Sequence, residues 1–160
     1  MTRRPAILLG IAAGLAWAVG VVVVGAQWPG TGLGLAEAMA LALAPGGAVL
    51  LALVARLAQR RFTGDALIDG APFVAPADRR TQAILTNTCE QLILAVALWP
   101  VVGLALGPAA VVVLGAAFGA SRILFWAGYA ISPPLRAFGF AGGFYATILA
   151  FAWAIARLLG

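Results

Sequence analysis

The chain of 160 residues has no histidine, no lysine and a single cysteine, Cys89. These absences exclude a Ser-His-Asp triad, a lysine Schiff base, a P-loop lysine and a histidine-ligated metal. One cysteine allows neither an intrachain disulfide nor a cluster of thiolates around zinc. Charge is also scarce, since ten arginines and five acids make up 9% of the chain, while 64% of the residues are hydrophobic. A soluble domain carries about 25% charged residues, so the composition indicates an integral membrane protein.

The few charges point away from two classes of partner. The net charge of +5 would favour nucleic acid in a soluble chain, but most arginines flank apolar segments, where they act as topology determinants. We therefore expect no nucleic-acid partner. Asp65, Asp69 and Asp78 lie in one polar segment with no histidine or further clustered carboxylate, so we also expect no metal.

Five apolar runs are long enough to cross a bilayer, whose core of about 30 Å requires roughly 20 helical residues. We predict membrane spans at residues 6–27, 35–55, 83–106, 109–130 and 135–155. The first run could instead belong to a signal peptide, but it exceeds the usual hydrophobic region of about 7 to 15 residues, and 25–27 form a poor cleavage site. Because backbone groups in lipid must be satisfied internally, we predict an all-α helical bundle.

The arginines predict the orientation of the bundle. If the N-terminus is cytoplasmic, only Arg157 lies on the opposite side. The other nine are Arg3, Arg4, Arg56, Arg60, Arg61, Arg79, Arg80, Arg122 and Arg136. Because positive residues concentrate on the cytoplasmic side, we predict a cytoplasmic N-terminus, in a bacterial inner membrane.

Polar residues inside the third and fourth spans form two clusters. Asn87 and Glu90 are three residues apart, and Arg80 lies about two turns before Asn87, so these three side chains face roughly one direction. Arg122 and Tyr129 share a face of the next span. With a cytoplasmic N-terminus both clusters lie toward the cytoplasmic ends of their helices, so we expect Arg122 to approach Asn87 and Glu90 from the neighbouring helix. Such residues could simply join helices through hydrogen bonds. In a membrane, each hydrogen bond of this kind stabilises the protein by about 0.6 kcal/mol on average. The arginine excess over Glu90 favours instead a site for an anionic ligand, and both interpretations remain open.

These clusters resemble the MAPEG family, the membrane-associated proteins of eicosanoid and glutathione metabolism, over approximately residues 35–160. Asn87 and Glu90 match the family's N-x-x-E on its second helix, with Arg80 matching an arginine seven positions earlier. A second motif, R-x(5)-G-Y-A-x(4)-L-R, matches at Arg122, Gly128, Tyr129, Ala130, Leu135 and Arg136. The chain departs from the family's pattern at Ala83, Gln91, Val111 and Gly115, where the family has an arginine or aromatic residues.

The resemblance implies a homotrimer of four-helix protomers, with glutathione bound between adjacent subunits near the cytoplasmic face. The family's first helix ends in a basic cluster, and Arg60-Arg61-Phe62 looks like that cluster. Residues 1–34 would then be an extra N-terminal helix with an outer loop. Residues 35–160 would form the MAPEG-like domain, with a cytoplasmic loop at 56–80.

Each predicted site residue has a role that suits the chemistry of glutathione. Arg80 and Arg136 could hold its carboxylates, Glu90 could accept from its amine, and Asn87 could bridge its peptide groups. Arg122 would face the thiol and favour the nucleophilic thiolate. Tyr129 could support the ligand or an arginine, or could be an interfacial anchor.

The sequence thus predicts a membrane protein that binds glutathione and acts as a transferase or peroxidase on a lipophilic electrophile arriving from the lipid. The alternative is a non-catalytic membrane protein whose polar cluster only stabilises helix or subunit packing. A small transporter is a weaker option, because the sequence has no broken-helix pairs or internal repeats.

Overall fold

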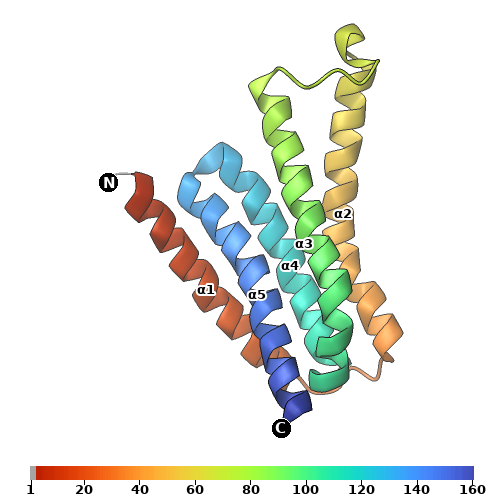
Figure 1. Cartoon of the computed structure of the whole chain (residues 1–160), viewed down its shortest axis with the longest axis vertical. Coiled ribbons are helices and arrows are strands. Elements are labelled where there is room, and N and C mark those ends of the chain that lie inside the picture. Colours follow the sequence, from red (N-terminus) through yellow and green to blue (C-terminus); the bar gives the residue numbers. More distant parts are fainter. Residues whose placement is uncertain (1–2) are drawn as a thin grey trace.

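The computed structural model describes residues 3–160, with side chains from Arg4 onward, as an all-helical bundle (Figure 1). The long helices are α1 (Arg3–Gln27), α2 (Leu35–Phe62), α3 (Pro76–Leu106), α4 (Pro108–Ile131) and α5 (Pro133–Leu159). A short 3-10 helix, η1 (Asp65–Leu67), lies between α2 and α3. All five long helices are long and apolar enough to cross a membrane, and the described residues contain no strand. The predicted all-α class is confirmed.

Helices extend into both ends of the polar segment 56–80, which we predicted as a loop. α2 continues to Phe62 because its buried face continues, with Leu53 and Leu57 four residues apart. α3 begins at Pro76, whose fixed φ suits the first turn of a helix. The connection is therefore shorter than expected and covers residues 63–75.

Helix α4 lies at the centre and contacts each of the other four helices. α1 packs mainly along α5 and also contacts α4, so it forms one side of the bundle (Figure 1). Gly10 makes this approach possible, since a methyl group there would overlap the Pro134 carbonyl at the start of α5. Further along both helices, Gly14 lies against Ala141, so α1 and α5 run in the same direction.

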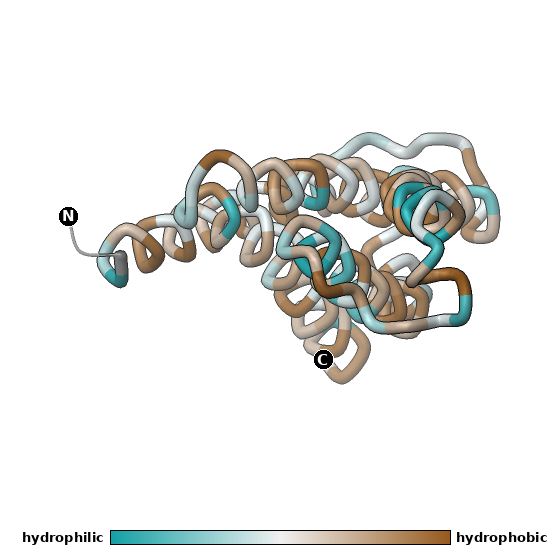
Figure 2. Tube along the Cα trace, turned by 90° about the horizontal axis from the view of Figure 1, so that it is seen from above, coloured by the Kyte–Doolittle hydropathy of each residue, from teal (hydrophilic) through white to brown (hydrophobic). Residues whose placement is uncertain are grey.

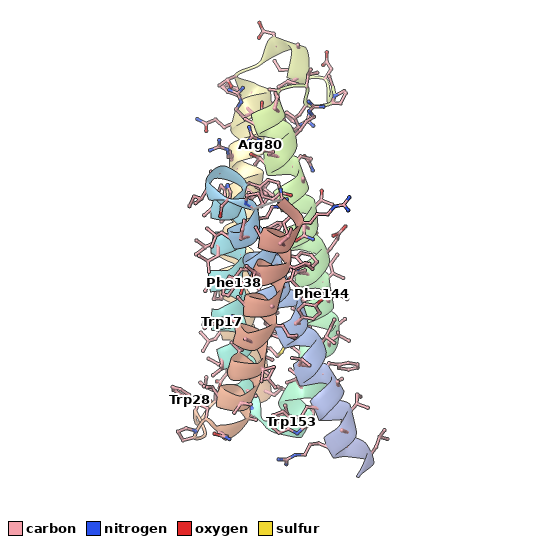
Figure 3. The ribbon with its side chains drawn as sticks, turned by 90° about the vertical axis from the view of Figure 1, so that its left-hand side faces the viewer. Trp17, Trp28, Arg80, Phe138, Phe144 and Trp153 are labelled. Carbon is pink, nitrogen blue, oxygen red and sulfur yellow. The ribbon has the colours of Figure 1, made fainter. Side chains whose placement is uncertain are left out.

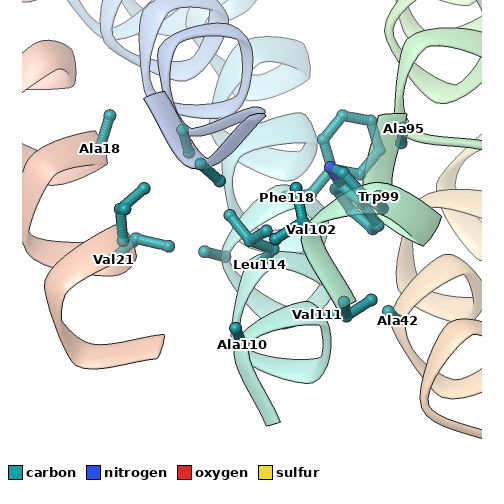
Figure 4. Close-up of a cluster of buried hydrophobic side chains, with 14 of the residues drawn as sticks. Ala18, Val21, Ala42, Ala95, Trp99, Val102, Ala110, Val111, Leu114 and Phe118 are labelled. Atoms are coloured by element: carbon teal, nitrogen blue, oxygen red, sulfur yellow. The ribbon is translucent and has the colours of Figure 1, made fainter. Parts of the chain in front are cut away.

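The main apolar core joins all five helices (Figure 4). Trp99 of α3 is completely buried and meets the edge of Phe118 of α4, with ring centroids 5.8 Å apart. Its Nε1 donates to Oγ1 of Thr147 at 3.2 Å, which satisfies the indole on α5. Ala18 and Val21 bring α1 into the same core. The N-terminal helix is therefore an integral part of the fold.

The outside of the bundle is apolar. Leu104 is 73% exposed and Leu51 70% exposed, and hydrophobic or intermediate colours cover most of each helix in Figure 2. An apolar surface of this kind is compatible with direct contact with lipid chains. The helix order places the start of α1, the α2–α3 loop and the α4–α5 turn toward one end, with the C-terminus at the other (Figure 1). Arg157 thus lies apart from the other arginines, as the sequence indicated.

Candidate functional site

The turn between α4 and α5 positions two of the predicted site residues. Ser132 ends α4, and its Oγ accepts from the Leu135 backbone N–H at 3.5 Å. Gly128 lets the backbone of Arg136 lie directly on α4, because a side chain at Gly128 would overlap that backbone. The Arg136 guanidinium carbon lies 4.8 Å from the centre of the Tyr129 ring. The glycine of the R-x(5)-G-Y-A motif therefore has a geometric role.

Arg122 is completely buried at the junction of α3, α4 and α5. Its Nη1 donates to Oδ1 of Asn87 on α3 at 2.9 Å, and its Nη2 donates to the Gly139 carbonyl on α5 at 2.7 Å. The guanidinium also lies 4.8 Å from the centre of the Phe125 ring. The structure thus brings Arg122 and Asn87 together, as we predicted from the sequence, and Arg122 joins three helices at this point.

The polar network around Arg122 is incomplete. Gln91 donates from Nε2 to Oδ1 of Asn87 at 3.5 Å, so this oxygen accepts hydrogen bonds from both Arg122 and Gln91. Four buried polar atoms have no hydrogen-bond partner among the described residues: Oε1 of Gln91, Nε of Arg122, Oγ1 of Thr88 and Oγ of Ser121. Each such atom costs about 1–3 kcal/mol when left unsatisfied. Each of these atoms therefore has a donor or acceptor available to water or to a bound molecule.

Two cavities open beside this network. The first has about 440 Å³ and is lined by Ile11, Asn87, Phe125, Tyr129, Arg136, Ala137 and Phe140. The second has about 820 Å³ and is lined by Ala6, Ile7, Arg80, Tyr129, Pro133, Pro134 and Arg136. Tyr129 and Arg136 line both cavities and so form their shared wall. We call the two together the arginine cavity. Four predicted site residues, Arg80, Asn87, Tyr129 and Arg136, line it.

The arginine cavity has a strong excess of positive charge. No acidic residue lines either part of it. Arg136 makes no side-chain hydrogen bond or ion pair with any described residue, and Arg80 bonds only the Pro76 carbonyl, at 3.2 Å. Arg122 lies one residue behind the cavity wall, where Asn87 and Phe125 separate it from the open space. The cavity therefore suits a ligand with more than one negative charge.

Glu90 lies outside this cavity. Its side chain is exposed on the surface of α3 and forms no hydrogen bond or ion pair with Arg122, Arg80 or any other described residue. Gln91 faces the bundle in its place, because the buried face of α3 runs through Thr88, Gln91 and Ala95. Sequence reasoning missed the inward position of Gln91, which the helical spacing of these buried residues could have indicated.

Arg60 and Arg61 do not reach the arginine cavity either. Arg60 forms an ion pair with Asp78 at 3.1 Å, which joins the end of α2 to the start of α3. Arg61 donates to the carbonyls of Leu67 and Ala71, both at 3.2 Å, and lies over the Phe73 ring. These two arginines hold the α2–α3 loop. No group of three or more potential metal ligands occurs among residues 3–160.

Fold and site together define an integral membrane helical bundle with a cationic cavity near one end. The chain belongs to the MAPEG family, whose model matches residues 38–157. The matched segment includes α3, α4, nearly all of α5 and most of α2, while α1 lies outside it. Searches of curated proteins and of solved structures find no match to the chain. Family membership confirms the resemblance and indicates a role in membrane glutathione or eicosanoid metabolism.

Proposed function

We propose that the protein binds glutathione in the arginine cavity and transfers it to a lipophilic electrophile, or reduces a lipid peroxide with it. The observation that carries this proposal is the pairing of Arg80 and Arg136 around cavities with no acidic lining residue. Glutathione has two carboxylates, which match two guanidinium groups that can each form forked hydrogen bonds.

The remaining groups of the cavity fit the rest of the tripeptide. Asn87 can hydrogen-bond its peptide groups, since an amide both donates and accepts. Phe125 and Phe140 offer an apolar surface beside the position of the thiol. Tyr129 supports the ligand through its hydroxyl, while its ring holds Arg136.

Arg122 activates the thiol through its electric field. Its charge has no ion-pair partner among the described residues and lies where water is excluded, one residue behind the cavity wall. A free thiol titrates near pH 8.5, and a nearby positive charge in a region of low dielectric favours the thiolate. Asn87, which accepts from Arg122 at 2.9 Å and also lines the cavity, connects the two.

The proposed reactions balance with the thiolate as the nucleophile. In transfer, the sulfur forms a bond to the electrophilic carbon, and the leaving group departs with the electrons of its own bond. In peroxide reduction, the sulfur takes one oxygen as the O–O bond breaks, and the alkoxide takes a proton. A second glutathione then displaces water from the sulfenic acid to give the disulfide.

We propose that the functional unit is a homotrimer in which a neighbouring subunit covers Glu90. An exposed carboxylate amid Ile93, Leu94 and Val96 on a membrane helix is expensive in lipid. A neighbour would shield it, and Glu90 would then meet the amine of a glutathione held in the neighbour's arginine cavity, so that the ligand lies between adjacent subunits. The proposed topology has a cytoplasmic N-terminus, four family helices from α2 to α5, and α1 as an addition, in a bacterial inner membrane.

The second candidate function is a structural protein without catalysis. It is favoured by one observation: the two hydrogen bonds of Arg122 join α4 to both α3 and α5. In that case the arginine cavity would bind nothing, and the polar network would only fix helix packing.

Calorimetric titration of the detergent-purified protein with glutathione separates these candidates, using Arg136→Gln as the informative variant. The Arg136 side chain has no hydrogen bond to lose, so its replacement should leave the fold intact and weaken glutathione binding about 30-fold, the value of one charge-assisted pair. Arg56→Gln, an exposed arginine that lines neither cavity, is the matched control. Absence of binding by a folded wild-type oligomer would favour the structural protein.

A further inference from the structure

Helix α1 provides part of the wall of the arginine cavity. Ile11 lines the part that contains Asn87, and Ala6 and Ile7 line the part that contains Arg80. Ile7 and Ile11 are four residues apart and therefore lie on one face of the helix. The cavity is thus cationic on α3 and α5 but aliphatic where α1 borders it.

Close packing fixes this wall in place. Gly10 lies between the two isoleucines and abuts the Pro134 carbonyl, and a Cβ atom at Gly14 would lie 2.9 Å from the Phe138 carbonyl. One turn further, the Trp17 ring lies 6.2 Å from that of Phe138 (Figure 3). These contacts hold α1 on the first turns of α5, which also carry Arg136. The aliphatic wall and the arginine therefore keep a fixed separation.

We propose that α1, the helix outside the family-matched segment, sets which apolar group can lie beside the glutathione sulfur, with Ile11 as its main specificity-determining residue. Ile11 shares the smaller part of the cavity with Phe125 and Phe140, which together form an apolar pocket next to Asn87. This inference rests on the proposed binding of glutathione. The expected occupant of the pocket is an alkyl or aryl group carried by the sulfur.

Equilibrium binding of S-alkyl glutathiones tests this pocket without requiring catalysis. Glutathione, S-methylglutathione and S-hexylglutathione are titrated into the full chain in detergent. The wild type should bind the S-hexyl compound more tightly than glutathione, because the hexyl chain leaves water for the apolar wall. Ile11→Ala should reduce that preference about tenfold, since it removes most of one aliphatic side chain from the contact.

Leu9→Ala is the matched control, because Leu9 is 61% exposed on α1 and lines neither cavity. It should leave the ratio of the two affinities unchanged. Ile11→Val removes a single methyl group and should shift the ratio about threefold, so it keeps the test informative if Ile11→Ala unfolds.

The outcomes distinguish the inference from the function on which it rests. If glutathione binds but S-hexylglutathione binds no better, or if Ile11→Ala and Ile11→Val leave the preference intact, α1 has no role in selection. If unmodified glutathione fails to bind the folded wild type, the proposed function is wrong, and the role of α1 in selecting its substrate is rejected with it.

Discussion

Two groups of arginines lie near the same end of the bundle and differ in how their charge is satisfied. In the α2–α3 loop, Arg60 meets the Asp78 carboxylate in three hydrogen bonds, and Arg61 is held by two carbonyls and an aromatic ring. Around the arginine cavity, the Arg136 side chain has no hydrogen bond or ion pair with any described residue and lies only over the Tyr129 ring. Arg122, like Arg61, has two neutral acceptors and no carboxylate.

The difference separates a structural use of arginine from a binding use. The loop arginines resemble the family's basic cluster in sequence, yet Arg60 is paired with Asp78 and Arg61 is bound to two backbone carbonyls. The cavity arginines keep donors and charge available, in a region where Oε1 of Gln91 also lacks a partner. An anionic ligand would give Arg80 and Arg136 the carboxylate partner that neither has among the described residues and that Arg60 already has.

The largest effect should come from Arg122→Met, which keeps much of the side-chain volume but removes the charge. The Asn87 amide and the Gly139 carbonyl would lose their shared donor, so we expect about 3 kcal/mol of destabilisation in addition to weaker glutathione binding. Thermal unfolding in detergent measures the first effect. Unchanged stability would contradict a stabilising role for the hydrogen bonds of Arg122 to Asn87 and Gly139.

A smaller effect is expected for Asp78→Asn in the loop group. It removes the carboxylate that Arg60 contacts and should lower stability by about 1–2 kcal/mol, because Asp78 is buried while Arg60 is half exposed. Glutathione affinity should stay at the wild-type value. If Asp78→Asn lost as much glutathione affinity as Arg136→Gln, the loop arginines would also contribute to binding, and the two groups would not differ in function.

The smallest effect should follow Arg80→Gln. Arg80 is exposed, and water competes for its charge, so glutathione binding should weaken about threefold with no change in stability. Arg79→Gln, an exposed neighbour that lines neither cavity, serves as the control. An equal loss of glutathione affinity in Arg80→Gln and Arg79→Gln would mean that Arg80 contributes only to the net positive charge and does not contact the ligand.

Much of this architecture could be predicted from composition and spacing. Five apolar runs gave five helices, because a helix that crosses lipid needs a minimum apolar length. The proximity of Arg122 to Asn87 followed from placing both toward the same end of neighbouring helices. The full lengths of α2 and α3 were not predicted from the sequence. Arginines on the exposed face of a helix make the segment resemble a polar loop, although the buried face of the helix continues.

The inward side of α3 and the place of α1 could not be predicted in the same way. Glu90 was expected beside Arg122, but a rotation of one residue along the helix brings Gln91 there and turns Glu90 outward. The sequence of α1 is apolar almost all round, so it specifies a membrane helix without specifying which neighbours it contacts. The packing of Gly10 on Pro134 holds α1 against α5, and the neighbouring Ile11 borders the cavity.

The most direct test of the central claim compares glutathione with its diethyl ester in calorimetric titrations of the wild-type protein. The ester keeps the peptide and the thiol but lacks both negative carboxylates. If the arginine cavity recognises those charges, glutathione should bind saturably and the ester at least about 30-fold more weakly. Equal affinity for the two compounds, or no binding of glutathione, would contradict the account.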